Sequence, residues 1–294
     1  MSTLQAYGAG LRQLFQQKKL WLLLYGINFL FALVVVLPLN GLFDDTVGNS
    51  LMLDRSLIKF DFVFISEFLN QFGDRLQDWM KSASLGLFLY FVFSIFLMGG
   101  ILNMLKANLT AFHQATFWSG TARYFWRLLR LSLYFLFVQA LLLFAFLRIF
   151  SACGLNPLCI ESDADLVLRF RWMSFIYVFA AISVFMLQDY SKIHLVHQEG
   201  SSLFKSFWSA IRLVFRNFKS CLPLYLLNLA VALLLTLLYW WLSGLPNKGS
   251  MSGIALVFLM SQLMIFVRIG IKLLNLSSAN HLYRRFVGFE GRPL

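Results

Sequence analysis

Residues 203–242 read LFKSFWSAIRLVFRNFKSCLPLYLLNLAVALLLTLLYWWL, a basic amphipathic segment that runs directly into a long apolar one. In the first part, basic and small polar residues recur at steps of three and four, so they share one face of a helix. A cationic stripe beside aromatic residues is typical of a helix that lies in the headgroup plane of a membrane. The apolar part is long enough, at about 1.5 Å per residue, to cross a hydrocarbon layer of about 30 Å. The stretch therefore predicts an interfacial helix, which we call an elbow, followed by a transmembrane span.

The same pattern occurs three times along the chain. The second copy lies 111 residues after the first, and the third lies 200 residues after the first. Three polar positions keep their spacing of seven and then nine residues in each copy: Arg12, Lys19 and Asn28; Arg123, Arg130 and Gln139; Arg212, Lys219 and Asn228. An internal repeat of this kind indicates a repeated helical unit. Each unit is expected to hold an elbow, an outward span, an outside loop and an inward span, over about 6–110, 114–198 and 203–285.

Six stretches are apolar and long enough to be spans. They are 20–42, 84–105, 128–150, 172–188, 221–242 and 253–276. About 60% of all residues are apolar and 13% are charged, and a soluble fold would have to bury 33 Phe and 8 Trp in 294 residues. The sequence therefore predicts an all-α, six-helix transmembrane bundle that forms a single membrane domain over 1–294. The first span is too long for a signal peptide and is expected to be an uncleaved signal anchor.

The net charge of +12 is distributed unevenly along the chain. With a cytoplasmic N-terminus, the inside segments hold 17 Lys/Arg and 3 Asp/Glu, and the outside segments hold 8 Lys/Arg and 10 Asp/Glu. The positive-inside rule accounts for this excess, so both termini are expected in the cytoplasm and nucleic acid is not expected as a partner. The expected partner is a bilayer with anionic headgroups. The elbow residues expected to contact these headgroups are Arg12, Lys19, Arg123, Arg127, Arg130, Arg212, Arg216 and Lys219.

Five polar residues inside the spans are predicted to form an intramembrane network: Asn28, Gln139, Asn228, Asp189 and Arg268. Amides in lipid need partners, so the three amides are expected to bond between helices. Asp189 and Arg268 lie at matching depth in their spans and are expected to pair, because a lone charge there is costly. Three alternatives stay open: a ring of amides that binds a solute, a pair that gates or couples proton movement, and an Asp189 that reaches cytoplasmic water. At the same depth Gly99 and Gly100 would admit a neighbouring helix or kink their own.

The outside loops carry two further predictions. In the first loop, 44–83, apolar residues at helical spacing alternate with acidic ones, which predicts an acidic surface helix that covers the outer ends of the spans or docks a partner. In the second loop, Cys153 and Cys159 enclose five residues that include Gly and Pro. An oxidising periplasm favours a disulfide there over two free thiols.

No catalytic residue, metal site or cofactor is predicted. His194 and His197 stand at i and i+3 with Glu199 nearby, but a zinc site needs at least a third ligand at compatible spacing. The chain has no glycine-rich phosphate loop and no Gly-x-Ser-x-Gly motif. The chain is therefore not expected to be an enzyme.

Three short motifs carry a resemblance to a known group. They are Phe207-Trp208-Ser209-Ala210, Asp189-Tyr190-Ser191-Lys192, and Arg268 followed by Asn280-His281-Leu282-Tyr283. With them the chain resembles a broad group of bacterial six-span proteins with elbow helices, which includes the membrane domain accompanying some glycerophosphodiester phosphodiesterases. The likeness covers most of residues 85–285, and no phosphodiesterase domain is attached. The resemblance therefore implies a bacterial inner-membrane location and no activity.

The sequence allows three functions. The first is a non-catalytic inner-membrane component that scaffolds a complex, with a partner protein in the membrane, or organises lipids. The alternative is a transporter or permease subunit for a small or amphiphilic solute, and the third is an enzyme that acts on lipids. A transporter predicts a polar cavity lined by the five network residues, whereas a scaffold predicts that these residues satisfy one another.

Overall fold

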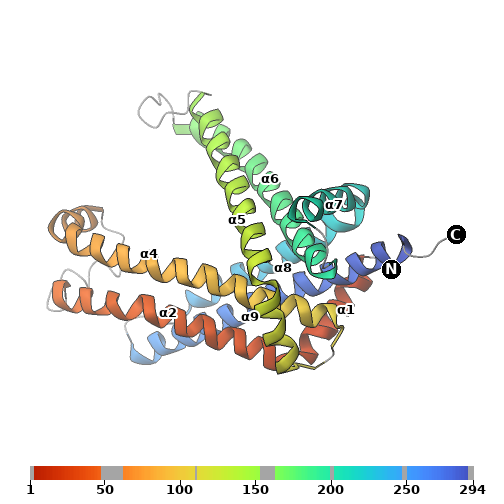
Figure 1. The fold of residues 1–294 in the computed structure, drawn as a ribbon. Coiled ribbons are helices and arrows are strands. Elements are labelled where there is room, and N and C mark those ends of the chain that lie inside the picture. Colours follow the sequence, from red (N-terminus) through yellow and green to blue (C-terminus); the bar gives the residue numbers. More distant parts are fainter. Residues whose placement is uncertain are drawn as a thin grey trace. The chain divides into compact units, whose positions relative to one another are not determined.

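The computed structural model describes residues 3–47, 62–109, 111–152, 163–198, 202–246 and 250–290 (Figure 1). These parts of the chain hold eight α-helices and no strand, which confirms the all-α prediction. The helices are α1 (Thr3–Gln16), α2 (Lys18–Val47), α4 (Phe62–Lys106), α5 (Gln114–Ala152), α6 (Asp163–His197), α7 (Leu203–Arg216), α8 (Phe218–Ser243) and α9 (Met251–Glu290).

Six of these helices are long and apolar enough to cross a membrane, namely α2, α4, α5, α6, α8 and α9. Their large side chains point outward: Phe137, Phe175 and Trp240 are 67%, 67% and 75% exposed. In water such a surface would be unfavourable, whereas in lipid it is the surface expected of a span. The chain is therefore a multi-pass membrane protein.

The chain divides into two compact units. Unit 1 comprises Met1–Trp21 and Ile95–Leu294, and unit 2 comprises Leu22–Ser94. The predicted single membrane domain over 1–294 stays a prediction.

Unit 2 pairs α2 with the first part of α4 in antiparallel fashion. Tyr90 Oη donates a hydrogen bond to Asn28 Oδ1 at 2.6 Å, and Trp79 Nε1 donates to Val35 O at 3.4 Å. From the Trp79 contact to the Tyr90 contact, the residue number increases from 79 to 90 in α4 and decreases from 35 to 28 in α2, so the two helices run in opposite directions. Gly86 faces Val35, where an added Cβ would lie 3.2 Å from Val35 Cγ2.

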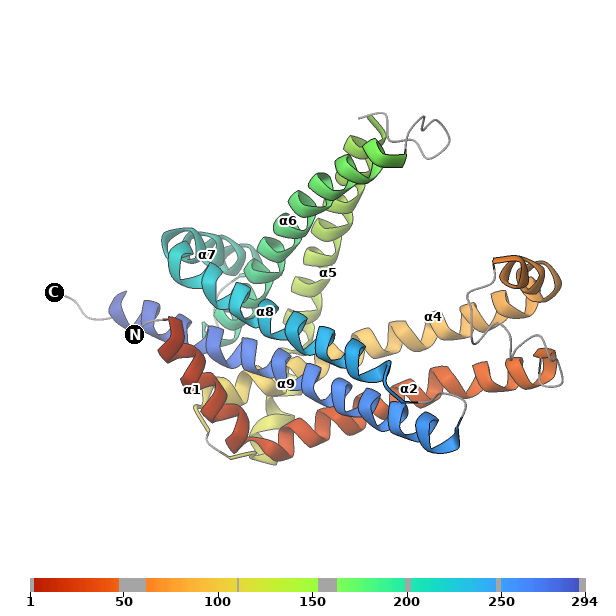
Figure 2. The ribbon, with the colours of Figure 1, turned by 180° about the vertical axis from the view of Figure 1, so that it is seen from behind.

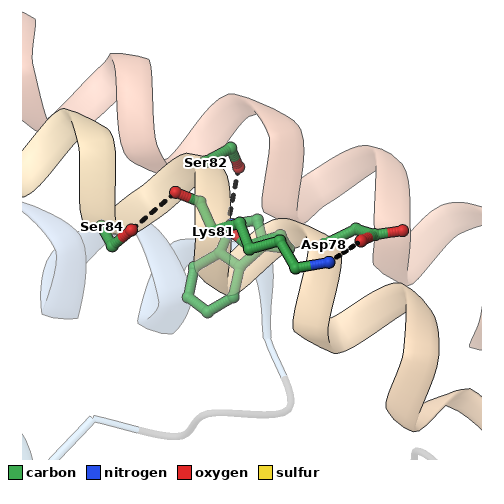
Figure 3. A network of polar contacts seen from close by, with 5 residues as sticks. Asp78, Lys81, Ser82 and Ser84 are labelled. Atoms are coloured by element: carbon green, nitrogen blue, oxygen red, sulfur yellow. Dashed lines mark hydrogen bonds and ion pairs between the residues drawn. The ribbon is translucent and has the colours of Figure 1, made fainter.

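The helical part of the predicted outside loop 44–83 differs from its prediction. It is not a separate surface helix, because α4 continues without interruption from Phe62 to Lys106. Its first turns are seen end-on in Figures 1 and 2 while the rest runs across the page, so the helix changes direction. Asp78 and Lys81 form an exposed ion pair of 2.9 Å on it, beside serine hydroxyls that bond to backbone carbonyls (Figure 3).

Unit 1 contains two hairpins and two short helices that pack on them. Helices α5 and α6 run side by side, as do α8 and α9 (Figures 1 and 2). Helix α1 packs on α9, and α7 packs on α6. The short helices and the ends of α4, α6 and α9 therefore define one end of unit 1, which we call the elbow end.

Two of the three predicted elbows are separate helices, and the second is not. Helix α1 ends before Gln17 and α7 ends before Asn217, whereas α5 runs through the equivalent position, Leu128. Gln17 Nε2 donates to Leu109 O at 2.9 Å, and Asn217 Nδ2 donates to Leu213 O at 3.1 Å. Each break thus has an amide side chain bonded to a backbone carbonyl, whereas Leu128 at the unbroken position is apolar and fully buried. The second elbow is therefore the first part of α5.

All three elbows bury small or apolar residues at two positions one turn apart. The pairs are Ala6 and Gly10 in α1, Phe117 and Thr121 in α5, and Ser206 and Ala210 in α7. In α1 the approach is close, because a Cβ on Gly10 would lie 3.0 Å from the backbone nitrogen of Ser278 in α9. The basic residues of the elbows lie on other faces of these helices.

The end of α4 is held by its own turn and by α9. Asn108 has a φ of 52°, and bonds from Asn108 N to Leu105 O and from Leu109 N to Met104 O complete a Schellman turn. From α9, Asn280 Nδ2 donates to Leu105 O at 3.2 Å, and Arg284 donates to the carbonyls of Leu105 and Lys106. A cation there also stabilises the negative end of the helix dipole.

Replacing Arg284 with methionine is expected to lower the free energy of unfolding by about 2 kcal/mol, because two carbonyls lose a charged donor. Thermal unfolding of the purified protein in detergent measures this loss. The matched control is Arg268→Met, an exposed arginine on the same helix. Equal losses in both variants would contradict the role assigned to Arg284.

Candidate functional site

A polar cluster joins three spans near the elbow end. Asp189 of α6 accepts hydrogen bonds from Tyr225 Oη of α8 at 2.8 Å and from Asn275 Nδ2 of α9 at 3.2 Å, both on Oδ2. Its other oxygen, Oδ1, lies 4.0 Å from Nζ of Lys192. Asn228 of α8 extends the cluster by donating to Asn275 Oδ1 at 3.1 Å. We call these five residues the Asp189 cluster.

The Asp189 cluster is largely shielded and carries no net formal charge. The side chains of Asp189 and Lys192 are 21% and 11% exposed, and Tyr225 is 7% exposed. Low local polarity strengthens such bonds and makes an unpaired member costly. The arrangement holds α6, α8 and α9 in one register. The carboxylate of Asp189 already accepts hydrogen bonds from Tyr225 and Asn275.

Three members of the Asp189 cluster, Lys192, Tyr225 and Asn275, were absent from the predicted network. Tyr225 precedes Asn228 by three residues and therefore shares its helical face, which is a signal that the sequence contains. Asn275 is an amide near the end of the predicted span 253–276, and amides are the residue type that predicted the rest of the network. The sequence does not show at which depth α9 packs against α6.

The predicted pair of Asp189 with Arg268 is wrong. Arg268 is exposed and lies two helical turns, about 10 Å, before Asn275, which is the residue of α9 that reaches Asp189. The prediction matched depths by counting from the outer ends of the spans. Helix α6 begins at Asp163, nine residues before the predicted outer end at 172, whereas α9 begins at Met251, two residues before the predicted 253, so that count matched Asp189 with a residue too near the outer end of α9.

The predicted amides do not share one site. Asn28 lies in unit 2, where it donates to Leu24 O at 2.6 Å and accepts from Tyr90. Gln139 lies on α5, and its Nε2 is buried without a hydrogen-bond partner among the described residues. Asn228 alone joins Asp189. The predicted network is therefore divided among separate places in the structure. Asn28 and Asn228 bond between helices as predicted, whereas no such bond is seen for Gln139.

The two histidines pack around a tyrosine. The rings of His194 and His197 lie 6.0 and 5.0 Å from the ring of Tyr283, centroid to centroid. His197 Nδ1 lies 3.0 Å from Ile193 O. Within the described ranges, no three His, Cys, Asp or Glu side chains are placed to hold a metal ion.

The basic residues of the elbows lie at the surface. Seven are exposed and Arg127 is half-buried; the exposed ones are Arg12, Lys19, Arg123, Arg130, Arg212, Arg216 and Lys219. Phe204, Trp208 and Phe215 of α7 are also exposed, by 74%, 55% and 70%. Helix α7 thus presents both cations and aromatic rings outward while its small residues pack inward.

Two pockets open at the elbow end of unit 1. One, of about 770 Å³, lies among α6, α7, the start of α8 and the end of α9, and we call it the Arg212 pocket. The other, of about 680 Å³, lies among α1, the turn after α4, and α9, and we call it the Arg12 pocket. Neither is lined by Asn28, Gln139, Asn228, Asp189 or Arg268. The predicted Cys153–Cys159 disulfide lies outside the described residues.

No family model, curated protein or solved structure matches the chain. The class of protein therefore rests on the helices themselves, which are those of a multi-pass membrane protein.

Proposed function

We propose that the chain is a non-catalytic integral protein of the bacterial inner membrane that organises anionic lipids at its elbow end, as a scaffold or lipid-organising part of a membrane complex. The observation that carries this proposal is the outward surface of α7. Exposed Arg212 and Arg216 stand beside exposed Phe204, Trp208 and Phe215. Aromatic rings favour the boundary between headgroups and acyl chains, and the cations favour anionic headgroups.

The proposal places the elbow end, and both termini, in the cytoplasm. The strong excess of Lys/Arg over Asp/Glu in the segments of this end supports that orientation. The proposal also includes the threefold repeat. Its support is that Gln17 and Asn217 break their helices 200 residues apart, and that the three elbows bury equivalent positions.

The Asp189 cluster supports a structural role for the intramembrane polar groups. The Asp189 carboxylate is bound by Tyr225 and Asn275 and lies near Lys192. It therefore has structural partners, and these contacts give no support for a solute path at this residue. The two pockets lie at the elbow end, apart from the predicted network residues. A protein that held lipid would have this arrangement, whereas a transporter would present these groups to a cavity.

Lipid analysis of protein extracted without detergent tests the proposal. Anionic phospholipids are expected to be enriched at least twofold over the surrounding membrane, because several exposed cations face the headgroups. The variant Arg12→Gln, Arg123→Gln, Arg212→Gln is expected to lose this enrichment. The matched control is Arg148→Gln, Arg171→Gln, two exposed arginines on α5 and α6 outside the elbows.

Two results would contradict the proposal. An unchanged lipid profile in the elbow variant would show that its cations do not organise lipid. A stoichiometric cytoplasmic ATPase bound at the elbow end, with solute flux that Asp189→Asn abolishes, would make the chain a permease subunit.

A further inference from the structure

The Arg212 pocket concentrates positive charge on walls from different helices. Arg212 and Arg216 come from α7, and Arg285 comes from the end of α9. None of the described residues that line it is acidic. Guanidinium groups bind phosphate oxygens through paired, directional hydrogen bonds, and arginines on facing walls can bind one group from two sides.

Neutral donors complete the floor of the same pocket. His194 of α6 lines it, is 5% exposed, and has a buried Nδ1 without a hydrogen-bond partner among the described residues. Asn217 and Ser220 line it at the start of α8, whose N-terminus has no side-chain cap bond. The first backbone N–H groups of a helix attract anions. The uncapped helix start, with Asn217 and Ser220 beside it, offers neutral donors to an anionic ligand.

The Arg12 pocket is built from equivalent positions of the first repeat. Its α1 wall includes Ala9, Arg12, Gln13 and Gln16, and the α7 wall of the Arg212 pocket is Ser209, Arg212, Leu213 and Arg216, each 200 residues later; Gln5 and Gly8 also line the Arg12 pocket and have no counterpart in the other. Both pockets also use α9, through His281 in one and Arg285 in the other. The Arg12 pocket carries one arginine where the Arg212 pocket carries three. The same groove therefore forms twice, and only one copy is strongly cationic.

We propose that the Arg212 pocket is a binding site for a phosphate-bearing anion, which at this position is the headgroup of an anionic phospholipid. This inference rests on the proposed function and adds a defined site to a surface that attracts anions in general. A volume of about 770 Å³ is within the usual range for small-molecule sites and is large enough for a glycerophosphate headgroup. Exposed Phe204, Trp208 and Phe215 on the same helix place the acyl chains at the interface.

The test uses the full chain in nanodiscs of phosphatidylcholine with a small fraction of phosphatidylglycerol, read by native mass spectrometry. One phosphatidylglycerol is expected to stay bound to the native protein. The variant Arg212→Gln, Arg285→Gln removes a cation from two walls and is expected to weaken retention at least tenfold. The matched control, Arg148→Gln, Arg171→Gln, removes two exposed arginines that lie outside the elbows and line neither pocket. It is expected to change retention less than twofold.

A second variant keeps the result interpretable if the first folds poorly. Ser209→Trp fills the pocket without removing charge and is expected to weaken retention as strongly as the double variant. Arg212→Lys, Arg285→Lys keeps the charge but loses the paired hydrogen bonds, and an intermediate loss is expected. Retention that follows charge alone, with Ser209→Trp equal to the native protein, would overturn the site.

Two further outcomes separate this proposal from the proposed function. A further variant, Arg123→Gln, Arg130→Gln, removes two elbow cations that line neither pocket. If it loses as much retention as the pocket variant, the site is overturned and general lipid organisation is left standing. No retained phosphatidylglycerol in the native protein, and no anionic enrichment in extracted membranes, would overturn both. An arm with glycerol 3-phosphate in lipid-free micelles identifies the source. If that ester stabilises the native protein but not the pocket variant, the phosphate site is supported with a soluble ligand, and if only phosphatidylglycerol does so, the lipid is the ligand.

Discussion

Replacing Asp189 with leucine is expected to lower the free energy of unfolding by about 3–5 kcal/mol, the usual cost of removing one partner from a buried ion pair. The variant leaves Lys192, whose side chain is 11% exposed, without its counter-charge. It also leaves Tyr225 and Asn275 without the acceptor that joins α6 to α8 and α9. Thermal unfolding in detergent measures the loss, which is expected to appear as a clearly lower midpoint and a lower yield of folded protein.

The chain supplies a matched control for this variant. Asp78 and Lys81 have the same i, i+3 spacing as Asp189 and Lys192, but their side chains are 76% and 68% exposed (Figure 3). Exposed pairs contribute about 0–1 kcal/mol, so Asp78→Leu is expected to leave stability nearly unchanged. If Asp189→Leu were no more harmful than Asp78→Leu, the Asp189 cluster would not hold the three helices together.

Replacing Gly100 with valine is expected to destabilise unit 1 by about 3 kcal/mol or more, near the upper end for overpacking. A Cβ on Gly100 would lie 2.7 Å from ring carbons of Phe117 and 2.8 Å from its backbone oxygen, so α4 and α5 would have to separate. A neighbouring contact is equally close, because a Cβ on Gly99 would lie 2.9 Å from Gly120 O. The measurement is the midpoint of thermal unfolding, together with the fraction of monodisperse protein on size exclusion.

Gly26→Val in the apolar span of α2 is the control, because a Cβ at Gly26 meets nothing within 4 Å. Its effect is expected to stay below about 1 kcal/mol, since valine is no worse than glycine in a helix. A result in which Gly26→Val and Gly100→Val are equally destabilising would mean that backbone flexibility, and not the close crossing, explains the glycine pair.

The glycine pair shows what a sequence can leave undecided. Two adjacent glycines in a span allow either a close crossing or a kink, and the residues themselves do not choose between these. The packing of α5 decides between them. The backbone of Gly120 lies against Gly99 and the ring of Phe117 lies against Gly100, so the structure has the close crossing. Phe117 and Gly120 are nearby in sequence, but only the packing of α5 on α4 brings them there.

The elbows show a similar division. The spacing of cations and aromatic residues predicts the amphipathic helices, because the period of a helix determines which residues share a face. The period does not show whether an elbow breaks from its span: the chain breaks at Gln17 and Asn217, whereas α5 continues through Leu128. The Arg212 pocket needs walls from α6, α7, α8 and α9, so no single stretch of sequence contains it.

The sequence by itself determined the all-helical class, the six spans and the exposed cations of the elbows, since all three follow from local hydrophobicity, length and helical period. Only the tertiary structure decided that Asp189 meets Tyr225 and Asn275 instead of Arg268. The reason is that a partner across three helices depends on how far each helix extends and how deeply it packs. An offset of two turns along α9, about 10 Å, changes the partner without changing the helical face.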